Sequence, residues 1–597
     1  MKRFLVIGLA ANLGFATIAL AQSPTHKPVM SAGAANADFA ALTARYIAAL
    51  VRVDPVSATQ LGDHRNDALL PNITAAGRAE RDTEWQAERA SLADIKRAAL
   101  SPELQVDAAL LDNDLAYRLW SDRTLQDWAW NAQLYNDIAA NSLYLLAARD
   151  FAPWPQRLTA ATARMEAIPA LLLETRRQLV PARVPRVFAE TVAKQNAGII
   201  EIADAMLAPH ADTLDAPARA RFDAALVALK IAVADQQHWL DTVLVPQAAG
   251  DFRLGAKLYD AKLAFAMQSK LSRPELKAKA QHAMATIRGE MYALSRTVLA
   301  GHAGAPPTPL LPNAAQQQAA IEAALAVSYA DHPKRADLEA AARRALEQAT
   351  QFVTDKGFVT MPDGPVRVIT MPKFQQGNAV AYDDPPGPLE RGQANFFAVS
   401  PVPDQWSDTQ AQSFLAEYNS YMIQDLAVHE AMPGHYLQLD HANHDPSTLR
   451  AIFSSGPFVE GWAVYAEGMM KDEGYLNRNP LYQLTVLKMR LRSVTNTLLD
   501  IGIQTEGMTR EQAMQLMMQG AFQQEREAAG KWVRASLSSV QLLSYFTGYE
   551  EHSALREEAR RRWGKSFTLR RYNDAVLAHG SPPIRYVREL MFGLPIN

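Results

Sequence analysis

The chain has 597 residues, of which 48% are apolar and 21% are charged, an ordinary balance for a globular protein large enough for more than one subdomain. Its formal net charge of −3 gives no reason to expect nucleic acid as a partner. It contains no cysteine, which excludes disulfides, a thiolate nucleophile, cysteine-bound metal and lipid attachment through an N-terminal cysteine.

The N-terminus has the pattern of an export signal. Lys2 and Arg3 precede an uncharged apolar run over 4–21 that ends in Ala-Leu-Ala, as in a signal peptide with a small-residue cleavage site. The run is also nearly long enough to span a bilayer, so an uncleaved membrane anchor is the competing interpretation. We favour cleavage after residue 21, which predicts a periplasmic or secreted bacterial protein without a membrane segment.

Most of the mature chain has helical patterning. Residues 22–37 are small and polar and predict a flexible leader. Over 38–352 apolar residues recur at helical spacing, as in Phe39, Leu42, Tyr46 and Leu50, which predicts a helical N-terminal region. The proline-rich string at 303–313 predicts a surface loop within it.

A catalytic region is expected over 353–597. It opens with the best strand patterns of the chain, at 358–361, 366–371, 379–382 and 395–399. The helical pattern returns at about 408, and one helix is expected to run from Phe414 to His429. The predicted fold class is therefore mainly α, with a small β-sheet preceding a helix that ends in the most informative motif.

That motif is the string HEAMPGH at 429–435. It resembles the zinc-hydrolase motif H-E-x-x-H, in which two histidines four residues apart share one helix face and bind one Zn²⁺. Here the histidines are six apart and would point about 120° away from each other on a regular helix, and Pro433 removes a helical hydrogen bond. Either His429 and His435 are unrelated, or the helix breaks at Pro433-Gly434 and returns His435 to the metal.

A third ligand is available on the next predicted helix. Glu460 begins the string EGWAVYAE, after the loop-forming string SSGP at 454–457. Glu467 follows seven residues later and therefore lies on the same face. Because an unpaired buried carboxylate is costly, both need partners. These partners are either a metal site or, alternatively, Arg490 or Arg492 in salt bridges.

Two histidines compete with Glu460 for the third position. His441 and His444 lie closer to the motif in sequence, but Asp445-Pro446 predicts a solvated loop around them, so Glu460 is the preferred ligand. The pair His429-Glu430, taken alone, is also compatible with a purely structural contact.

The strings VHEAMPGHYLQ and VEGWAVYAEG together resemble the bacterial family called domain of unknown function 885, which is placed among gluzincin-like metallopeptidases, near the angiotensin-converting-enzyme and carboxypeptidase Taq groups. The resemblance extends over roughly 38–595, and its most specific part is 379–467. It implies a mostly helical fold, a small sheet and one Zn²⁺ per chain, held by His429, His435 and Glu460.

The remaining roles follow from that resemblance and from zinc-hydrolase chemistry. Glu430 is expected to act as the general base, and Glu467 to orient a ligating histidine. Tyr545, in the family-like string SYFTG, is expected to stabilise the developing oxyanion, with Tyr549 as the alternative. The chain departs from the family pattern at Gln504 and Asn573, where relatives commonly have histidine; if those histidines contact substrate, specificity or rate differs here.

The predicted function is an exported zinc-dependent peptidase that hydrolyses short peptides through a metal-activated water, as a carboxypeptidase or dipeptidase. Two alternatives stay open: a metal-dependent hydrolase of another amide or ester, and a catalytically inactive peptide-binding protein of the same fold. The expected partner is a peptide substrate, with no nucleic acid and no membrane after signal cleavage. Substrate sequence, end preference, oligomeric state and physiological role are not determined by the sequence.

Overall fold

A computed structural model describes residues 32–371, 381–390, 392–403 and 406–597. The signal peptide predicted over 1–21 lies outside these residues. α1 (Ala32–Val53) begins inside the leader predicted over 22–37, so the end of that segment is helical rather than irregular. Ala35 and Phe39 are buried where α1 packs against α3 and α4. The many alanines of α1 favour a helix, and tertiary packing of its apolar face adds to this preference.

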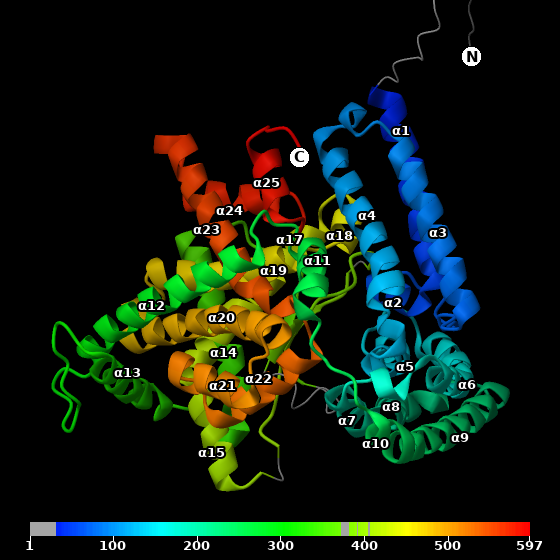
Figure 1. The fold of residues 1–597 in the computed structure, drawn as a ribbon, viewed down its shortest axis with the longest axis horizontal. Coiled ribbons are helices and arrows are strands. Elements are labelled where there is room, and N and C mark those ends of the chain that lie inside the picture. The colour runs from blue at the N-terminus through cyan, green and yellow to red at the C-terminus, as the bar shows by residue number, and fades with distance from the viewer. Residues whose placement is uncertain (1–31, 372–380, 391, 404–405) are drawn as a thin grey trace, which may run out of the picture.

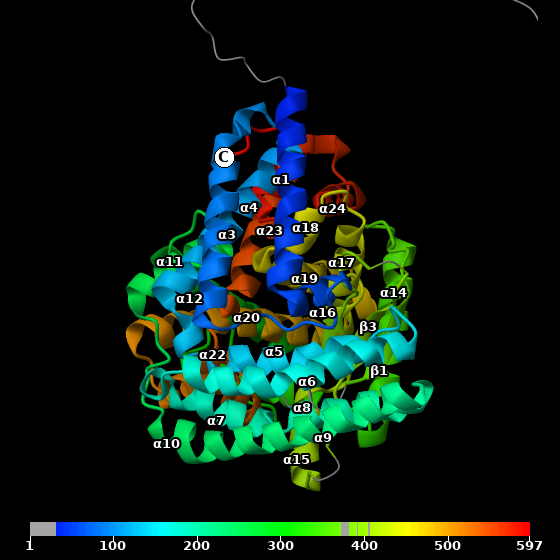
Figure 2. The same ribbon diagram turned by 90° about the vertical axis from the view of Figure 1, so that its right-hand side faces the viewer.

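The first part of the chain forms an arm beside the rest of the molecule (Figure 1). Its upper part contains α1, α2 (Pro55–Leu61), α3 (Ala75–Asp94) and α4 (Pro102–Trp120). Its lower part contains α5 (Ala132–Ala147), α6 (Trp154–Gln178), α7 (Arg186–Gln195), α8 (Gly198–Ile202), α9 (Ala216–Trp239) and α10 (Val245–Gln247). Figure 2 shows α1, α3 and α4 standing above this lower layer.

Helices of the region expected over 38–352 contact more than one part of the molecule. The arm is followed by α11 (Gly255–Met267), α12 (Arg273–Val298), α13 (Ala314–Tyr329) and α14 (Leu338–Lys356). Of these, α12 and α13 pack on α20 (Pro480–Glu506), a helix from the C-terminal part of the chain. Met291, Ile321 and Leu487 from the three helices share one buried cluster. Apolar faces pair by complementarity rather than by sequence proximity, so these contacts between α12, α13 and α20 could not be read from the sequence.

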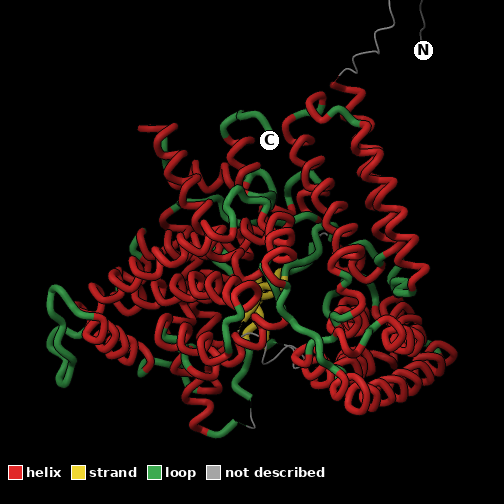
Figure 3. Tube along the Cα trace, in the orientation of Figure 1, coloured by secondary structure: helices red, strands yellow, loops and turns green. Residues whose placement is uncertain are grey.

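In the view of Figure 3 the small sheet lies among helices, near the middle of the molecule. It has the order β1-β3-β2, with β1 (Val366–Thr370) parallel to β3 (Asn395–Val399) and β2 (Ala381–Asp384) antiparallel to it. The strand predicted over 358–361 is not formed. The backbone there bonds to α24 (Leu569–Leu577) instead, because Asn573 donates to the Phe358 carbonyl and the Thr360 amide donates to Asp574.

The single helix expected from Phe414 to His429 is two helices. α15 (Asp408–Glu417) ends before Asn419, whose side chain caps α16 (Ser420–Glu430) by accepting from the Tyr421 and Met422 amides. An asparagine at this position satisfies amides that would otherwise lack partners. Apolar spacing continues across the interruption, which is why periodicity alone missed it.

The remaining helices are α17 (His435–Asn443), α18 (Thr448–Ile452), α19 (Gly456–Asp472), α20, α21 (Arg510–Gln515), α22 (Glu525–Leu537), α23 (Ser544–Trp563), α24 and α25 (Ile584–Met591). The fold is mainly α, as predicted. Within the part of the chain that the structure describes, no helix has both the length and the apolarity needed to cross a membrane.

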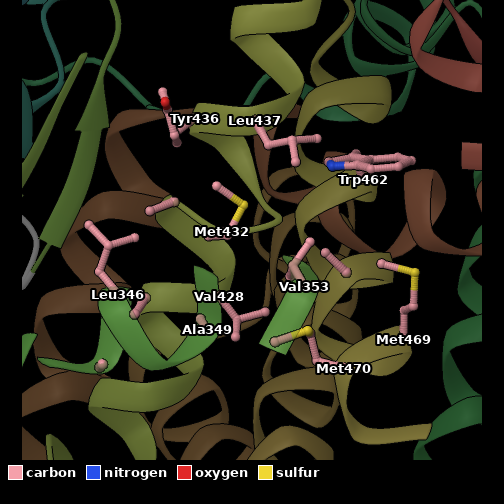
Figure 4. Close-up of a cluster of buried hydrophobic side chains, with 14 of the residues drawn as sticks. Leu346, Ala349, Val353, Val428, Met432, Tyr436, Leu437, Trp462, Met469 and Met470 are labelled. Atoms are coloured by element: carbon pink, nitrogen blue, oxygen red, sulfur yellow. The ribbon is translucent and has the colours of Figure 1, made fainter. Parts of the chain in front are cut away.

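A hydrophobic cluster lies under the motif and fixes the helices that carry it. Figure 4 shows Val428 and Met432 from the motif segment packed with Val353 of α14 and Trp462 of α19. All four side chains are almost fully buried. Each such side chain contributes roughly 1.5–3 kcal/mol when removed from water, so the motif segment rests on a rigid support.

One arginine connects the arm to the sheet. Arg149, just beyond α5, donates to the carbonyl oxygens of Asp384, Pro385 and Ala394 at 2.7, 2.8 and 2.8 Å. It also pairs with the Asp384 carboxylate at 2.9 Å. This contact holds the arm against the end of β2, beside the motif.

Candidate metal centre

The two histidines of the motif lie on different helices. α16 ends at Glu430 and α17 begins at His435, so the helix breaks at Pro433-Gly434 as expected. Gly434 is required at this break, because a Cβ there would lie 1.8 Å from the carbonyl oxygen of His429. The close return brings the two imidazole rings to a centroid separation of 4.8 Å at an interplanar angle of 86°.

Glu460 reaches the same point from α19. Ser455 caps this helix through the Phe458 amide, and the helix packs tightly on α23. Gly548 permits that contact, since a Cβ at this position would lie 1.9 Å from the Pro457 carbonyl oxygen. One carboxylate oxygen, Oε2 of Glu460, lies 3.7 Å from Nε2 of His429 and 3.4 Å from Nε2 of His435.

These three atoms have the spacing of a metal site. His429, His435 and Glu460 each offer one ligand atom, and all three atoms lie within 4.8 Å of one another. Ligands at about 2.0–2.1 Å from a tetrahedral Zn²⁺ are about 3.4 Å apart, close to the two separations to Glu460. Two imidazole nitrogens and one carboxylate are also the donor set of catalytic zinc sites that keep a fourth position open. The residues therefore fit Zn²⁺.

The rings and the carboxylate carry complementary charge. Burial favours the neutral form of Glu460, but its contacts with both histidines outweigh this and lower its pKa. Burial lowers the pKa of His429. The carboxylates of Glu460 and Glu467 outweigh this effect and raise the pKa of the imidazole well above its ordinary value. The site thus concentrates negative charge around two imidazoles, as a cation site requires.

Glu467 holds the His429 ring in place. Its Oε1 lies 2.6 Å from Nδ1 of His429, which leaves Nε2 directed at Glu460. Glu467 is fully buried, and so is Asp425 one turn before His429. Burial, and after it the charge of Glu467, raises the pKa of Asp425 well above its ordinary value. By contrast, Nδ1 of His435 has no hydrogen-bond partner among the described residues.

Glu430 lies beside the three ligands and faces the sheet. Its Oε2 accepts a hydrogen bond from the backbone N–H of Asp383 on β2 at 3.1 Å. Burial raises the pKa of Glu430, and the two histidines act against that shift. A carboxylate with a raised pKa next to a cation site is suited to accept and return a proton.

The two candidate tyrosines lie one turn apart on α23. Burial raises the pKa of Tyr545, and the charge of Glu460 adds to the shift while Arg534 and His429 oppose it; its hydroxyl lies 3.3 Å from the Arg534 guanidinium. Tyr549 lies one turn further along α23, where the Arg490 guanidinium lies 4.4 Å from the centroid of its ring.

The competing partners are occupied elsewhere. Nε2 of His441 bonds the Thr360 carbonyl and Nδ1 of His444 bonds the Asp440 carbonyl, and neither belongs to the metal-spaced cluster of the described residues. Arg492 pairs with Glu527 rather than with Glu460 or Glu467. Among the described residues, neither a third histidine nor a salt bridge to Arg492 therefore accounts for Glu460 and Glu467, whose contacts are with the two histidines of the motif.

The family model for "Bacterial protein of unknown function (DUF885)" matches residues 55–591. The chain belongs to this family. No curated protein matches the chain. Two solved structures, each named a "putative lipoprotein", are similar to it. The one from Shewanella oneidensis is 33% identical, with a TM-score of 0.79, covering 93% of this chain and 99% of its own. The one from Colwellia psychrerythraea is 16% identical, with a TM-score of 0.71, covering 94% and 99%, and shows the shared fold alone.

The two departures from the family pattern have structural contacts in this DUF885 protein. Gln504 is buried and bonds the Leu254 amide and the Ser538 carbonyl at 3.0 and 3.1 Å. Asn573 is buried, donates to the Phe358 carbonyl and accepts from the Tyr465 hydroxyl. Both side chains hold segments of backbone together, and neither belongs to the triad.

Sequence reasoning missed several groups near the triad: Asp383, Asp425, Lys531 and Arg534. Asp425 had a detectable signal, because a residue four positions before His429 shares its helix face. The other three had none. Asp383 contributes only its backbone N–H, which any residue except proline could supply. The charged residues of α22 have the spacing of an ordinary solvated helix face.

Proposed function

We propose that this DUF885 protein is an exported zinc-dependent peptidase, with Zn²⁺ held by His429, His435 and Glu460. The observation that carries the proposal is the convergence of these three ligand atoms next to the partly buried carboxylate of Glu430. The same arrangement supports a relationship with gluzincin-like metallopeptidases, in which the third ligand is a glutamate from a second helix.

Each residue then has a chemical role. When bound, zinc would polarise the scissile carbonyl and lower the pKa of a water so that it attacks near neutral pH. Glu430 accepts a proton from the attacking water and returns it to the leaving amine. The Tyr545 hydroxyl donates to the oxygen on which negative charge develops. Glu467 keeps the His429 ring in the tautomer and orientation that ligation needs.

The position of β2 at the edge of the sheet favours a peptide as the substrate. This strand pairs with β3 along one side only and is the edge of the sheet in the described residues. The Asp383 amide on its other side faces Glu430. An edge strand offers backbone donors and acceptors to an extended peptide, so a substrate paired there would lie along the proposed base.

Export is supported by the signal-peptide pattern over 1–21 and by the names of the two similar structures. Because this chain has no cysteine, lipid attachment through an N-terminal cysteine is not open to it.

The proposal is tested by metal content and by one substitution. Elemental analysis should find about one zinc per chain, as a single three-ligand site requires. Glu430→Gln should retain zinc and lose turnover against a peptide library analysed by mass spectrometry. Absence of zinc, with no activity after zinc addition, would exclude the function. Zinc binding with no peptide cleaved would instead favour another amide or ester substrate, or a binding protein.

A further inference from the structure

The end of β2 is held by a side chain of the arm. Arg149 donates to the carbonyl oxygens of Asp384, Pro385 and Ala394 at 2.7, 2.8 and 2.8 Å and pairs with the Asp384 carboxylate at 2.9 Å. Its guanidinium also lies 4.9 Å from the ring centroid of Phe396, the residue of β3 that pairs with Asp384. Arginine suits this place because its planar group presents five N–H donors in fixed directions. One side chain thus satisfies the backbone where β2 and β3 diverge.

Arg149 is itself fixed from the side of the arm. Its carbonyl oxygen accepts a hydrogen bond from Arg157 of α6. The Arg157 guanidinium is almost fully buried, lies 3.6 Å from the ring centroid of Trp154 and pairs with Asp150 at 3.0 Å. Because α6 packs on α5 and α9 within the arm, the position of Arg149 depends on the arm and not only on the strand that it contacts.

A second contact holds the segment that follows β2. The ring of His64, a residue just beyond α2, lies between two carboxylates, with Nδ1 2.9 Å from Asp67 and Nε2 3.4 Å from Glu390. This ring stacks on Phe151 of the arm at a centroid separation of 3.6 Å and an interplanar angle of 5°. The arm therefore holds the segment at two points, directly after β2 and at Glu390.

The residue before the Arg149 contact reaches the proposed base. Asp383 precedes Asp384 on β2, and its backbone N–H donates to Oε2 of Glu430 at 3.1 Å. Among the described residues this is the only hydrogen bond to the Glu430 carboxylate. Fixing one oxygen of a carboxylate also fixes the direction of the other, so the position of β2 determines where Oε1 of Glu430 points.

We propose that Arg149 is a positioning residue of the peptidase: by holding the end of β2 it keeps the Asp383 amide against Glu430 and so directs Oε1 for the proton transfer. This role rests on the proposed function and adds the arm to it, because turnover then depends on a contact made from outside the catalytic region predicted over 353–597. A reacting group that is displaced by about 1 Å loses much of its rate. The three metal ligands make no hydrogen bond or ion pair with Arg149 in the described parts of the chain, so zinc binding should not depend on it.

Arg149→Met removes these contacts, and Arg288→Met is its matched control. Arg288 donates to the carbonyl oxygens of Gln519 and Gly520 at 3.0 and 2.8 Å and lies 4.9 Å from the Phe522 ring centroid. With a peptide that the wild type cleaves, we expect kcat of Arg149→Met to fall at least tenfold, with a smaller change in KM and unchanged zinc content. Arg288→Met should keep the wild-type kcat. Arg149→Lys should recover part of the loss, because an ammonium can still donate to some of the carbonyls.

Hydrogen exchange followed by mass spectrometry gives a measurement that does not depend on turnover. The amides of residues 381–384 should exchange at least tenfold faster in Arg149→Met than in the wild type, because loosening of β2 opens its hydrogen bonds. In Arg288→Met they should exchange at the wild-type rate. If Arg149→Met fails to fold, Arg149→Lys carries both measurements, with faster exchange at 381–384 and a lower kcat than Arg288→Lys.

The outcomes separate the positioning role from the peptidase function. Unchanged exchange at 381–384 in Arg149→Met, or the same loss of kcat in both methionine variants, would overturn the positioning role and leave the peptidase proposal intact. If exchange is faster but the wild-type protein cleaves no peptide, the contact with β2 stands, and the peptidase function fails together with the role of Arg149 in it.

Discussion

The indole of Trp462 donates a hydrogen bond to the carbonyl oxygen of Pro433 at 2.9 Å. The donor lies two residues after Glu460, and the acceptor lies two residues before His435. One buried hydrogen bond therefore joins the helix that carries the third ligand, Glu460, to the helix break that positions the second ligand, His435.

Replacing Trp462 with phenylalanine should weaken zinc binding as well as the fold. The Pro433 carbonyl would be left buried without a donor, which costs roughly 1–3 kcal/mol, and the two ligand-bearing elements would lose their direct connection. We expect a zinc dissociation constant at least tenfold higher, measured by chelator competition. Trp128→Phe is the matched control, since Trp128 makes a similar bond to the Asp122 carbonyl at 3.1 Å in the arm. An equal loss of zinc affinity in both variants would contradict the connection.

Gly434→Ala should abolish zinc binding. The new Cβ would meet the His429 carbonyl oxygen at 1.8 Å, and because that atom is backbone, the return of His435 toward His429 must open. Gly289→Ala provides the control, because nothing lies within 4 Å of a Cβ there and alanine improves a helix interior by up to about 1 kcal/mol. Thermal unfolding with and without zinc should show stabilisation by the metal in the control and none in Gly434→Ala.

Glu467→Gln should lower zinc affinity by about 10–100-fold, as outer partners of a ligating histidine commonly do. The amide can accept from Nδ1 of His429 through its oxygen, but it lacks the negative charge that increases the basicity of the ring. Asp472→Asn, on the same helix and with a half-exposed side chain, removes a comparable charge away from the site. If both variants bind zinc as the wild type does, Glu467 does not tune the ligand.

Acid should destabilise the metal-free protein partly through His552. This ring is fully buried, its Nε2 donates to the Phe458 carbonyl, and burial lowers its pKa to about 4. The unfolded chain takes up this proton near pH 6.5 and the folded chain only near pH 4, so stability present above pH 6.5 is lost on acidification. The loss is about 2 kcal/mol by pH 5 and about 3 kcal/mol below pH 4.

Urea unfolding of the metal-free protein at pH 7.5 and pH 5 measures this loss. His552→Gln keeps a donor for the Phe458 carbonyl but cannot titrate, so its stability should fall less between the two pH values than that of the wild type. The same pH dependence in both proteins would show that His552 is not the group responsible.

The mainly helical fold and the small sheet before the motif were predictable, since both depend on local periodicity. The strand expected over 358–361 and the single helix expected over 414–429 were wrong for a physical reason. In the first case side chains from α24 bond the backbone, and in the second Asn419 caps a new helix inside a continuous apolar pattern. Neither side-chain contact can be recognised from the spacing of apolar residues in the sequence.

The sequence by itself predicted the break between His429 and His435, because Pro433 and Gly434 act on their own backbone, and it offered Glu460, His441 and His444 as candidates for the third ligand. Only the tertiary structure decided that Glu460, rather than His441 or His444, meets the histidines. This outcome depends on how α19 packs against α17 and α23. Contacts between distant helices are properties of that packing and not of any local pattern.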